Sequence, residues 1–159
     1  MLDAINRFFS DYLAAPADGA GSVEDEEHRL QLATAALLIE VTRVERRDDP
    51  DEAAAAERAV RQKFGLDAEE TATLLQLARE EIERSVSYYE FTSLIHDQFD
   101  ARSKERIIEL MWRVAAADGH VNKHQEALVR KIADLLYVPH KAYIAAKLRG
   151  LSAEGIELA

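Results

Sequence analysis

The sequence predicts an all-α protein, a single compact bundle of about seven to eight helices, and three observations support this class. Ala, Leu, Glu and Arg, which favour helices, dominate the composition. Three prolines and six glycines in 159 residues are too few for a turn-rich β-sandwich. Apolar residues recur at helical spacing along most of the chain, so almost no strand is expected.

The composition also narrows the classes of function. The formal net charge is −10, and nucleic-acid binding is not expected because phosphate contacts need a basic face. The chain has no cysteine, which excludes disulfides and thiolate metal sites and is compatible with the cytoplasm, where we expect the protein. No apolar run reaches the length of about 18 residues that a transmembrane helix needs. Neither a phosphate-binding glycine loop nor a nucleophile elbow occurs, so no enzymatic activity is expected.

Residues 1–15 form the first expected element, a short amphipathic helix. Charged residues interrupt its apolar stripe and no basic segment precedes it, which is unlike a signal peptide. Packing on the core is the favoured interpretation, because helices that lie on membranes usually have a polar face rich in Lys and Arg. Contact with a membrane surface or with a partner's groove is the alternative. The residues for such a contact are Leu2, Ile5, Phe8, Phe9 and Tyr12.

An acidic linker is expected at residues 16–27, and the main helical domain is placed at residues 28–150. The linker contains proline, glycine and serine before its acidic run. The first long helix is expected from about Glu26 to about Arg46, because apolar residues recur there at helical spacing. Its acidic first turn suits the positive end of the helix dipole.

Local start and stop signals place the next two helices. Asp49 followed by Pro50 predicts a helix start, and Gly65 is expected to adopt the positive φ of a helix end. Asp67 is expected to cap a further helix that runs to about Val86.

Similar signals place the helices in the second half of the chain. A short aromatic helix is expected from about Tyr88 to about Asp97, and Asp100 is expected to cap the helix after it. Pro139 is expected to start the last helix, which should end near Gly150. The tail, residues 151–159, is expected to be frayed.

The most informative stretch is residues 117–126, called the second hinge below. The apolar-periodic helix before it, which carries Trp112, is expected to end at Gly119, because glycine tolerates positive φ. Core packing is the favoured interpretation of Trp112. Asn122 is expected to cap the next helix, and Gln125 completes a capping box with it.

Two helix-hinge-helix units share one pattern, which indicates an internal repeat. Residues 37–41 align with residues 110–114, and the same offset aligns the cap Asp49 with the cap Asn122. The joint of the first copy, residues 45–52, is called the first hinge below. Two divergent copies predict a pseudo-twofold domain in which each helix pair covers the apolar face of the other.

The second hinge carries potential metal ligands. Its two histidines are four residues apart, which is the spacing of histidine pairs that bind zinc from one helix face. The predicted cap at Asn122 lies between them, so the favoured interpretation is a solvated polar hinge. A site for zinc or a similar divalent ion, without catalysis, is the alternative. Its ligands would be Asp118, His120 and His124, with Glu126 and His140 as additional ligands.

The first hinge is rich in carboxylates and has arginines beside them. The favoured interpretation is an exposed helix cap whose charges are solvated and partly paired. Weak binding of a hard cation through oxygen ligands is the alternative. The carboxylates are Glu45, Asp48, Asp49, Asp51 and Glu52.

Short motifs in the second copy are shared with a known family. They are Ala117-Asp118-Gly119-His120-Val121, Asn122-Lys123-His124-Gln125-Glu126 and Ile132-Ala133-Asp134-Leu135-Leu136-Tyr137-Val138-Pro139-His140. The segment that contains them resembles the TerB-like domain of tellurite resistance proteins, and residues 37–66 resemble its first half. The resemblance implies an all-helical fold, a role in bacterial stress and tellurite resistance, no enzymatic activity, and acidic hinges that bind metal ions or partner proteins.

The first copy departs from the pattern of this family. Residues 44–46 read Val-Glu-Arg where the second copy has Ala-Asp-Gly. Arg47 and Asp51 stand where the second copy has His120 and His124. Because the glycine is lost and arginine is present, a symmetric pair of metal sites is not expected. If one hinge binds metal, we expect it to be the second.

These features predict a non-enzymatic interaction or metal-responsive module whose working surface is the acidic hinge. A protein partner is expected, and no catalytic residue is assigned. The first alternative is a protein that holds a divalent cation at the second hinge. The second alternative is a module that docks on a membrane or a partner through residues 1–15.

Overall fold

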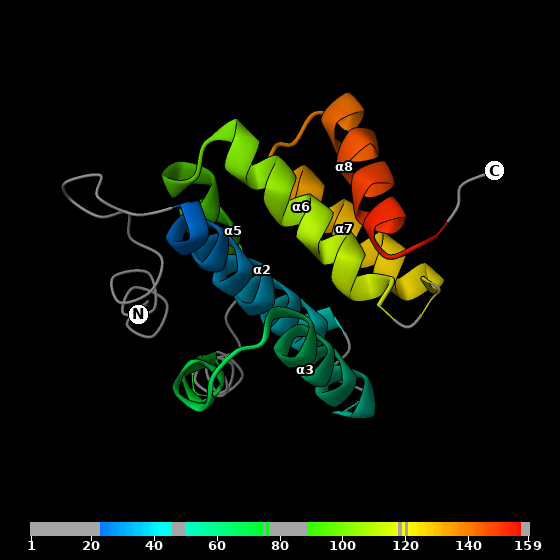
Figure 1. Ribbon diagram of the computed structural model, residues 1–159. Helices are drawn as coiled ribbons and strands as arrows, with labels where there is room; N and C mark the ends of the chain where they lie inside the picture. The colour runs from blue at the N-terminus through cyan, green and yellow to red at the C-terminus, as the bar shows by residue number, and fades with distance from the viewer. Residues whose placement is uncertain are drawn as a thin grey trace. The chain divides into compact units, whose positions relative to one another are not determined.

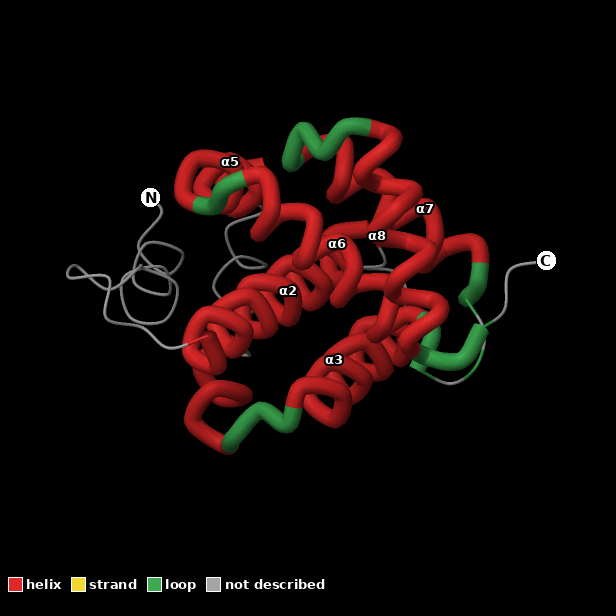
Figure 2. Tube along the Cα trace, turned by 45° about the horizontal axis from the view of Figure 1, so that its top comes forward, coloured by secondary structure: helices red, strands yellow, loops and turns green. Residues whose placement is uncertain are grey.

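The protein is helical throughout the part of the chain that its computed structural model describes, which is residues 23–45, 50–74, 76, 89–117, 119 and 121–156. Figure 1 shows the helices in chain order, and Figure 2 shows only helices and loops over these residues. The predicted all-α class is therefore confirmed. The chain divides into two compact units, residues 1–91 and residues 92–159. Within the described ranges, no helix combines the length and the apolar character that crossing a bilayer requires.

The first unit is built on two long helices, α2 (Val23–Glu45) and α3 (Pro50–Phe64), which pack against each other. Residues 32–39 of α2 are all buried, so the middle of this helix is covered on every side. Thr34 lies in this buried stretch, and its hydroxyl donates to the carbonyl oxygen of Leu30 at 2.7 Å. That bond satisfies the one polar side chain in the stretch.

The local signals of the sequence fix the ends of these helices. The predicted start of α3 at Pro50 is confirmed, as is its end before Gly65, where φ is +60°. The next helical segment, residues 68–74, begins at a reciprocal cap: the Glu70 N–H donates to Asp67 Oδ1 at 2.8 Å, and the Asp67 N–H donates to Glu70 Oε1 at 3.1 Å. The end predicted for this helix, at about residue 86, lies outside the described residues.

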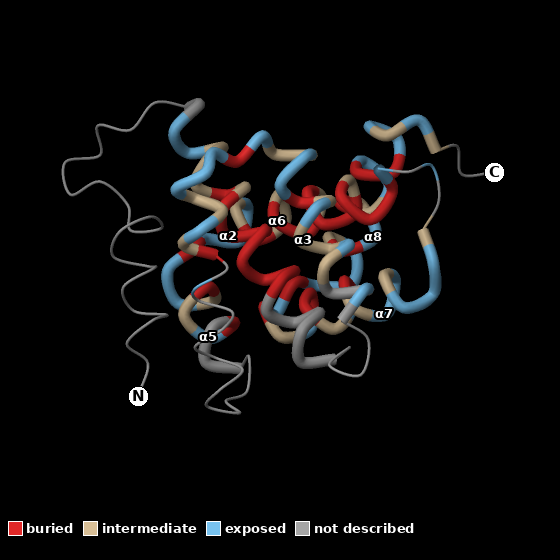
Figure 3. The backbone as a smooth tube through the Cα atoms, turned by 90° about the horizontal axis from the view of Figure 1, so that it is seen from below, coloured by how far each residue is buried: buried red, intermediate tan, exposed pale blue. Residues whose placement is uncertain are grey.

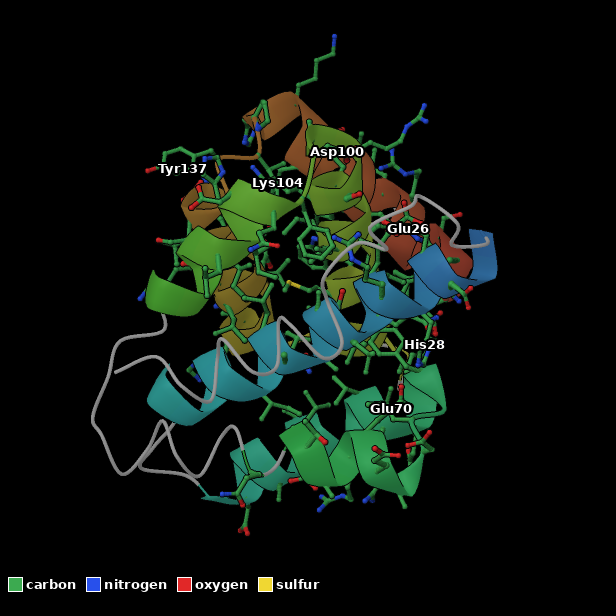
Figure 4. The ribbon with its side chains drawn as sticks, turned by 90° about the vertical axis from the view of Figure 1, so that its left-hand side faces the viewer. Glu26, His28, Glu70, Asp100, Lys104 and Tyr137 are labelled. Carbon is green, nitrogen blue, oxygen red and sulfur yellow. The ribbon has the colours of Figure 1, made fainter. Side chains whose placement is uncertain are left out.

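The acidic linker predicted for residues 16–27 is wrong over residues 23–27, which form the first turns of α2. The carboxylates in this run interact favourably with the partial positive charge at the helix N-terminus, so they extend the helix. The side chain of His28, one turn further on, contacts the carboxylate of Glu70. Figure 4 shows these two side chains facing each other, so the contact ties α2 to the helical segment 68–74.

The second unit contains the last turns of α5 (Tyr89–Gln98), followed by α6 (Ala101–Ala115), α7 (Lys123–Leu135) and α8 (His140–Ala153). Both α7 and α8 pack on α6. The start of α6 is confirmed at Asp100, whose Oδ1 accepts from the Ser103 N–H at 2.8 Å. Figure 3 shows how much of α6 is buried. Its buried apolar residues are Ile107, Ile108, Leu110, Met111, Trp112, Val114 and Ala115.

Positions that the internal repeat aligns are buried alike. Leu37 and Leu110 are 0% and 1% exposed. Val60 and Ile132, which align after the register slips by one residue within the second helix of each copy, are 1% and 0% exposed. Each copy therefore uses the same helix faces for its core, as a duplicated helix pair should. That the two pairs cover each other's apolar faces stays a prediction.

The sequence predicted that the last helix ends near Gly150. Instead, Gly150 lies inside α8, where this helix crosses α6. A Cβ atom at this position would lie 2.7 Å from the Glu109 carbonyl oxygen and 2.7 Å from Trp112 Cβ. Glycine is therefore required by the close approach of the two helices. The predicted frayed tail is also wrong at its start, because α8 continues to Ala153 and Leu151 is buried.

Gly150→Ala should destabilise the protein by about 1–3 kcal/mol, because the added methyl group forces α8 away from α6. At an ordinary helical glycine the same change would stabilise by about 1 kcal/mol. Urea unfolding followed by circular dichroism measures the difference. Ser152→Ala, at an exposed position of α8, is the control and should change the stability little. A stabilised Gly150→Ala variant would show that the two helices do not meet at this residue.

Candidate functional site

The second hinge joins α6 to α7 through a tight turn. The chain leaves α6 through the cap residue Ala116, whose N–H donates to the Trp112 carbonyl at 2.9 Å. The Gly119 N–H then donates to the Ala116 carbonyl at 2.9 Å. Gly119 has a φ of +97°, which side-chain-bearing residues rarely adopt, so the predicted role of this glycine is confirmed.

The predicted capping box at the start of α7 is present. Asn122 Oδ1 accepts from the Gln125 N–H at 2.8 Å, and Gln125 Oε1 accepts from the Asn122 N–H at 2.9 Å. Two N–H groups that the helix itself leaves free are thereby satisfied. Because both side chains are used by the cap, they belong to the frame of the hinge and are not available as ligands.

The predicted metal ligands of the second hinge divide into two groups. His124, Glu126 and His140 are exposed, whereas Asp118 and His120 lie outside the described residues. Over the part of the chain that the structure describes, no three histidine or carboxylate side chains come together in a way that would hold a metal ion. The metal site therefore stays a prediction that depends on Asp118 and His120.

Glu126 connects the hinge to α8. Its Oε1 lies 3.6 Å from Nζ of Lys147, so the hinge carboxylate is paired with a cation of the last helix. The same Nζ lies 5.0 Å from the centre of the Trp112 ring, in the geometry of a cation–π contact. Lys147 thus links the exposed hinge to the buried core of the unit. No sequence pattern signalled this residue, because the contact depends on the crossing of α6 and α8.

Trp112 is the buried residue that Lys147 contacts. It is 1% exposed, which confirms its predicted place in the core, and its ring centre lies 6.2 Å from that of Tyr143. Among the buried side-chain atoms of the described residues, Trp112 Nε1 is without a hydrogen-bond partner. An unsatisfied buried donor costs about 1–3 kcal/mol, which the burial of the large ring offsets.

Tyr143 lies on α8, and its phenol has a raised pKa. Burial is the largest cause, because it disfavours the phenolate. The negative charges of Glu126 and Asp134 raise the pKa further, and Arg130 lowers it. All three charged residues lie on α7, and Glu126 is also part of the second hinge.

A second polar cluster lies where α5 meets α6, and sequence reasoning missed it. Nζ of Lys104 contacts Nδ1 of His96, and the His96 ring lies 4.6 Å from the Tyr137 ring, centre to centre. Lys104 is 8% exposed, and burial lowers its pKa while Asp97 and Asp100 act in the opposite direction. Figure 4 shows Lys104 and Tyr137 on the same side of the unit.

Tyr137 of this cluster has an unusual backbone. It follows α7 with a φ of +58° and occupies the left-handed position at which helices often end with glycine. Its N–H donates to the Asp134 carbonyl at 3.1 Å, and the Val138 N–H donates to the Ala133 carbonyl at 3.0 Å. These bonds close the end of α7, although the left-handed conformation costs a tyrosine about 1–2 kcal/mol.

The remaining predicted contact residues are mostly outside the described part of the chain. In the first hinge, α2 ends at Glu45, Asp51 is exposed at the start of α3, and residues 46–49 are not described. The predicted helix of residues 1–15, with Leu2, Ile5, Phe8, Phe9 and Tyr12, also lies outside the described residues. Both contact surfaces stay predictions.

Comparison with known proteins gives one match. The model of a protein family described as tellurite resistance protein TerB matches residues 31–148, which include both hinges and all six of the labelled helices in whole or in part. Searches among curated proteins and among solved structures find no match.

Asn122→Ala should destabilise the protein by about 1 kcal/mol, because it removes the side chain that caps α7. Urea unfolding measures the loss. Asn122→Ser, which keeps a side-chain oxygen for the cap, should retain most of the stability. Equal losses in the two variants would mean that the cap bond is not what stabilises the start of α7.

The free energy of unfolding should fall as the pH rises above the ordinary tyrosine pKa of 10.0, because the folded protein holds the Tyr143 proton to a higher pH than the unfolded chain does. The stabilisation is complete below this pH and is lost as the pH rises through the pKa of the folded state. Urea unfolding between pH 8 and pH 11 tests this. The fall should be shallower in Tyr143→Phe than in the wild type. Tyr137→Phe, at an exposed tyrosine, is the control, and an equal change in both variants would contradict the assignment.

Proposed function

The chain belongs to the TerB family of tellurite resistance proteins, and from this premise we propose that it is a non-enzymatic helical module of a stress response whose working surface is the second hinge. On this surface it binds a partner protein or responds to a divalent metal ion. The proposal excludes a catalytic role for the residues of the hinge.

One observation carries the proposal: a histidine and a carboxylate are exposed at the start of α7, and the capping box uses neither of them. The capping box consumes Asn122 and Gln125, and Gly119 serves the turn. His124 and Glu126 are exposed in the first turn of α7. Side chains on the capped first turn of a helix are well placed to meet a ligand, because the helix backbone has little conformational entropy left to lose on binding.

The charge of the chain supports a cationic partner. The formal net charge is −10, which attracts basic surfaces over several ångströms at physiological salt. The Glu126 carboxylate is 53% exposed although it faces Lys147, so a basic side chain of a partner can compete for it. A basic segment that contacts the second hinge is therefore the kind of protein partner that we propose.

A divalent metal ion is the second candidate, and the chemistry of the donor set supports it. Imidazole nitrogens and carboxylate oxygens are common ligands of zinc. We propose Asp118, His120 and His124 as the ligands, with Glu126 or His140 as an additional ligand. Because metal ligands must give up their protons, binding of Zn²⁺ at this site should release protons to the solution.

The two candidates give different results in a paired experiment. Calorimetric titration of the metal-free full chain with Zn²⁺, Ni²⁺, Ca²⁺ and Mn²⁺ should show saturable binding of Zn²⁺ if the hinge is a metal site, with an affinity at least about tenfold lower in His124→Ala. Affinity purification from stressed cells, with and without added Zn²⁺, should show a partner that the His120→Ala/His124→Ala/Glu126→Ala variant fails to retain. Lys123→Ala, at an exposed neighbour that is not a candidate ligand, is the control for both measurements.

Three outcomes are informative. Saturable Zn²⁺ binding that depends on His124 supports the metal candidate. A partner that is lost only in the triple variant supports the interaction candidate. No saturable heat, together with an unchanged set of partners, would remove the second hinge as the working surface.

A further inference from the structure

The large hydrophobic side chains that are exposed within the described residues all lie in one short stretch of chain. They are Tyr137 at 74% exposure, Ile144 at 37% and Leu148 at 46%. Single exposed apolar residues scattered over a surface are ordinary and need no explanation. Here they are confined to the turn before α8 and to α8 itself. Such confinement is typical of a surface that contacts another molecule.

The spacing within α8 places these side chains on one face. Lys141, Ile144 and Leu148 follow one another at intervals of three and four residues, so they form a continuous line along the helix. All three are exposed, whereas Tyr143, Ala146 and Gly150 lie on the buried face. Tyr137 precedes the N-terminal end of this line. The four residues Tyr137, Lys141, Ile144 and Leu148 are called the α8 strip below.

Tyr137 is held in place although it is mostly exposed. Its ring lies against that of His96, and His96 in turn contacts Lys104 of α6. Its positive φ is a conformation that tyrosine rarely adopts, so local structure does not explain the residue. An exposed aromatic side chain with a fixed position is a typical anchor of a protein interface, because it loses little entropy on binding.

Contacts with α6 hold the helix that carries the α8 strip in place. Gly150 brings α8 into direct contact with α6, and Arg149 Nε donates to Glu109 Oε1 of α6 at 2.6 Å. Two residues before Arg149 in the same helix, Lys147 is held between Glu126 and the Trp112 ring. The outer face of α8 is therefore a preorganised surface.

Lys141 determines the chemistry of a partner. It lies in the middle of the strip, and no ion pair joins it to any of the described residues. The whole of α8, from His140 to Ala153, contains no aspartate or glutamate. Lys141 is exposed on the same face as Ile144 and Leu148, so a carboxylate on a partner that covers these two side chains would pair with its ammonium group.

We propose that the α8 strip is a docking surface for an acidic amphipathic helix of a partner protein. Apolar side chains of that helix pack on Tyr137, Ile144 and Leu148, and a glutamate or aspartate between them pairs with Lys141. This surface is separate from the second hinge and does not depend on a metal ion or on the residues proposed for that site.

A synthetic helical peptide tests the proposal with the full-length protein. Its leucines are spaced three and four residues apart along one face, and its other positions carry glutamate and alanine. Fluorescence anisotropy should show saturable binding, which weakens at least about tenfold in Leu148→Glu and in Lys141→Glu. A peptide with lysine in place of every glutamate should bind at least about tenfold more weakly than the acidic peptide.

Matched variants on α7 control for the added charge. Ala127→Glu and Lys123→Glu change exposed residues in the same two ways and should leave peptide binding intact. His124→Ala should also leave it intact, so a failure of the hinge proposal is distinguishable from a failure of this one. Thermal melts of all variants establish that each one folds.

Four results would overturn the proposal. The first is equal binding of the acidic and basic peptides. The second is a dimer of the chain, seen in sedimentation, that Leu148→Glu dissociates, and the third is tighter peptide binding after removal of residues 1–22. The fourth is binding to anionic phosphatidylglycerol vesicles but not to the acidic peptide. The second and third would assign the strip to another copy of the chain or to its own N-terminal segment. The fourth would assign it to a lipid surface.

Discussion

The contact between α6 and α8 at Gly150 is the constraint on which the second unit depends. A side chain at this position would overlap the Glu109 carbonyl and Trp112, so the two helices meet backbone to backbone. That approach buries Tyr143 against Trp112 and brings Lys147 over the indole ring. It also fixes which face of α8 is turned outward. The crossing at Gly150 therefore determines two surfaces of the unit. It places Lys147 beside Glu126 of the hinge, and it turns Ile144 and Leu148 outward.

The polar contacts of the second unit serve different purposes. The caps at Asp100 and Asn122 satisfy N–H groups that the helices leave free, and they act locally. The pair of Glu126 and Lys147 lies at the surface, where water screens its charges, so its role is to position side chains more than to stabilise the fold. The contact between His96 and Lys104 is partly buried and holds the corner between α5 and α6. The left-handed backbone of Tyr137 is the costly element among them, and it places an aromatic ring on the surface.

The internal repeat distinguishes the residues that build the hinge from the residues that are candidates for binding a ligand. Buried helix faces occur in both copies, and the sequence has a cap residue at the same place in each, so these features belong to the fold. His120 and His124 occur only in the second copy, which makes them the residues that architecture does not require. Membership of the TerB family gives this difference a context, because the match spans both copies. Within the family fold, this chain has one hinge with histidines and one with arginine and carboxylates.

The sequence by itself determined the all-α class, most helix ends and the core position of Trp112. Asp67, Asp100 and Asn122 were identified as caps because a cap bond joins residues three positions apart, and such a pattern is visible in the chain. Trp112 was placed correctly because helical periodicity reports which face is buried. Only the tertiary structure decided that Gly150 is a helix crossing, that Lys147 meets Glu126 and Trp112, and that His96 contacts Lys104. These contacts join different helices, and no local signal in a single sequence encodes the distance at which two helices pack.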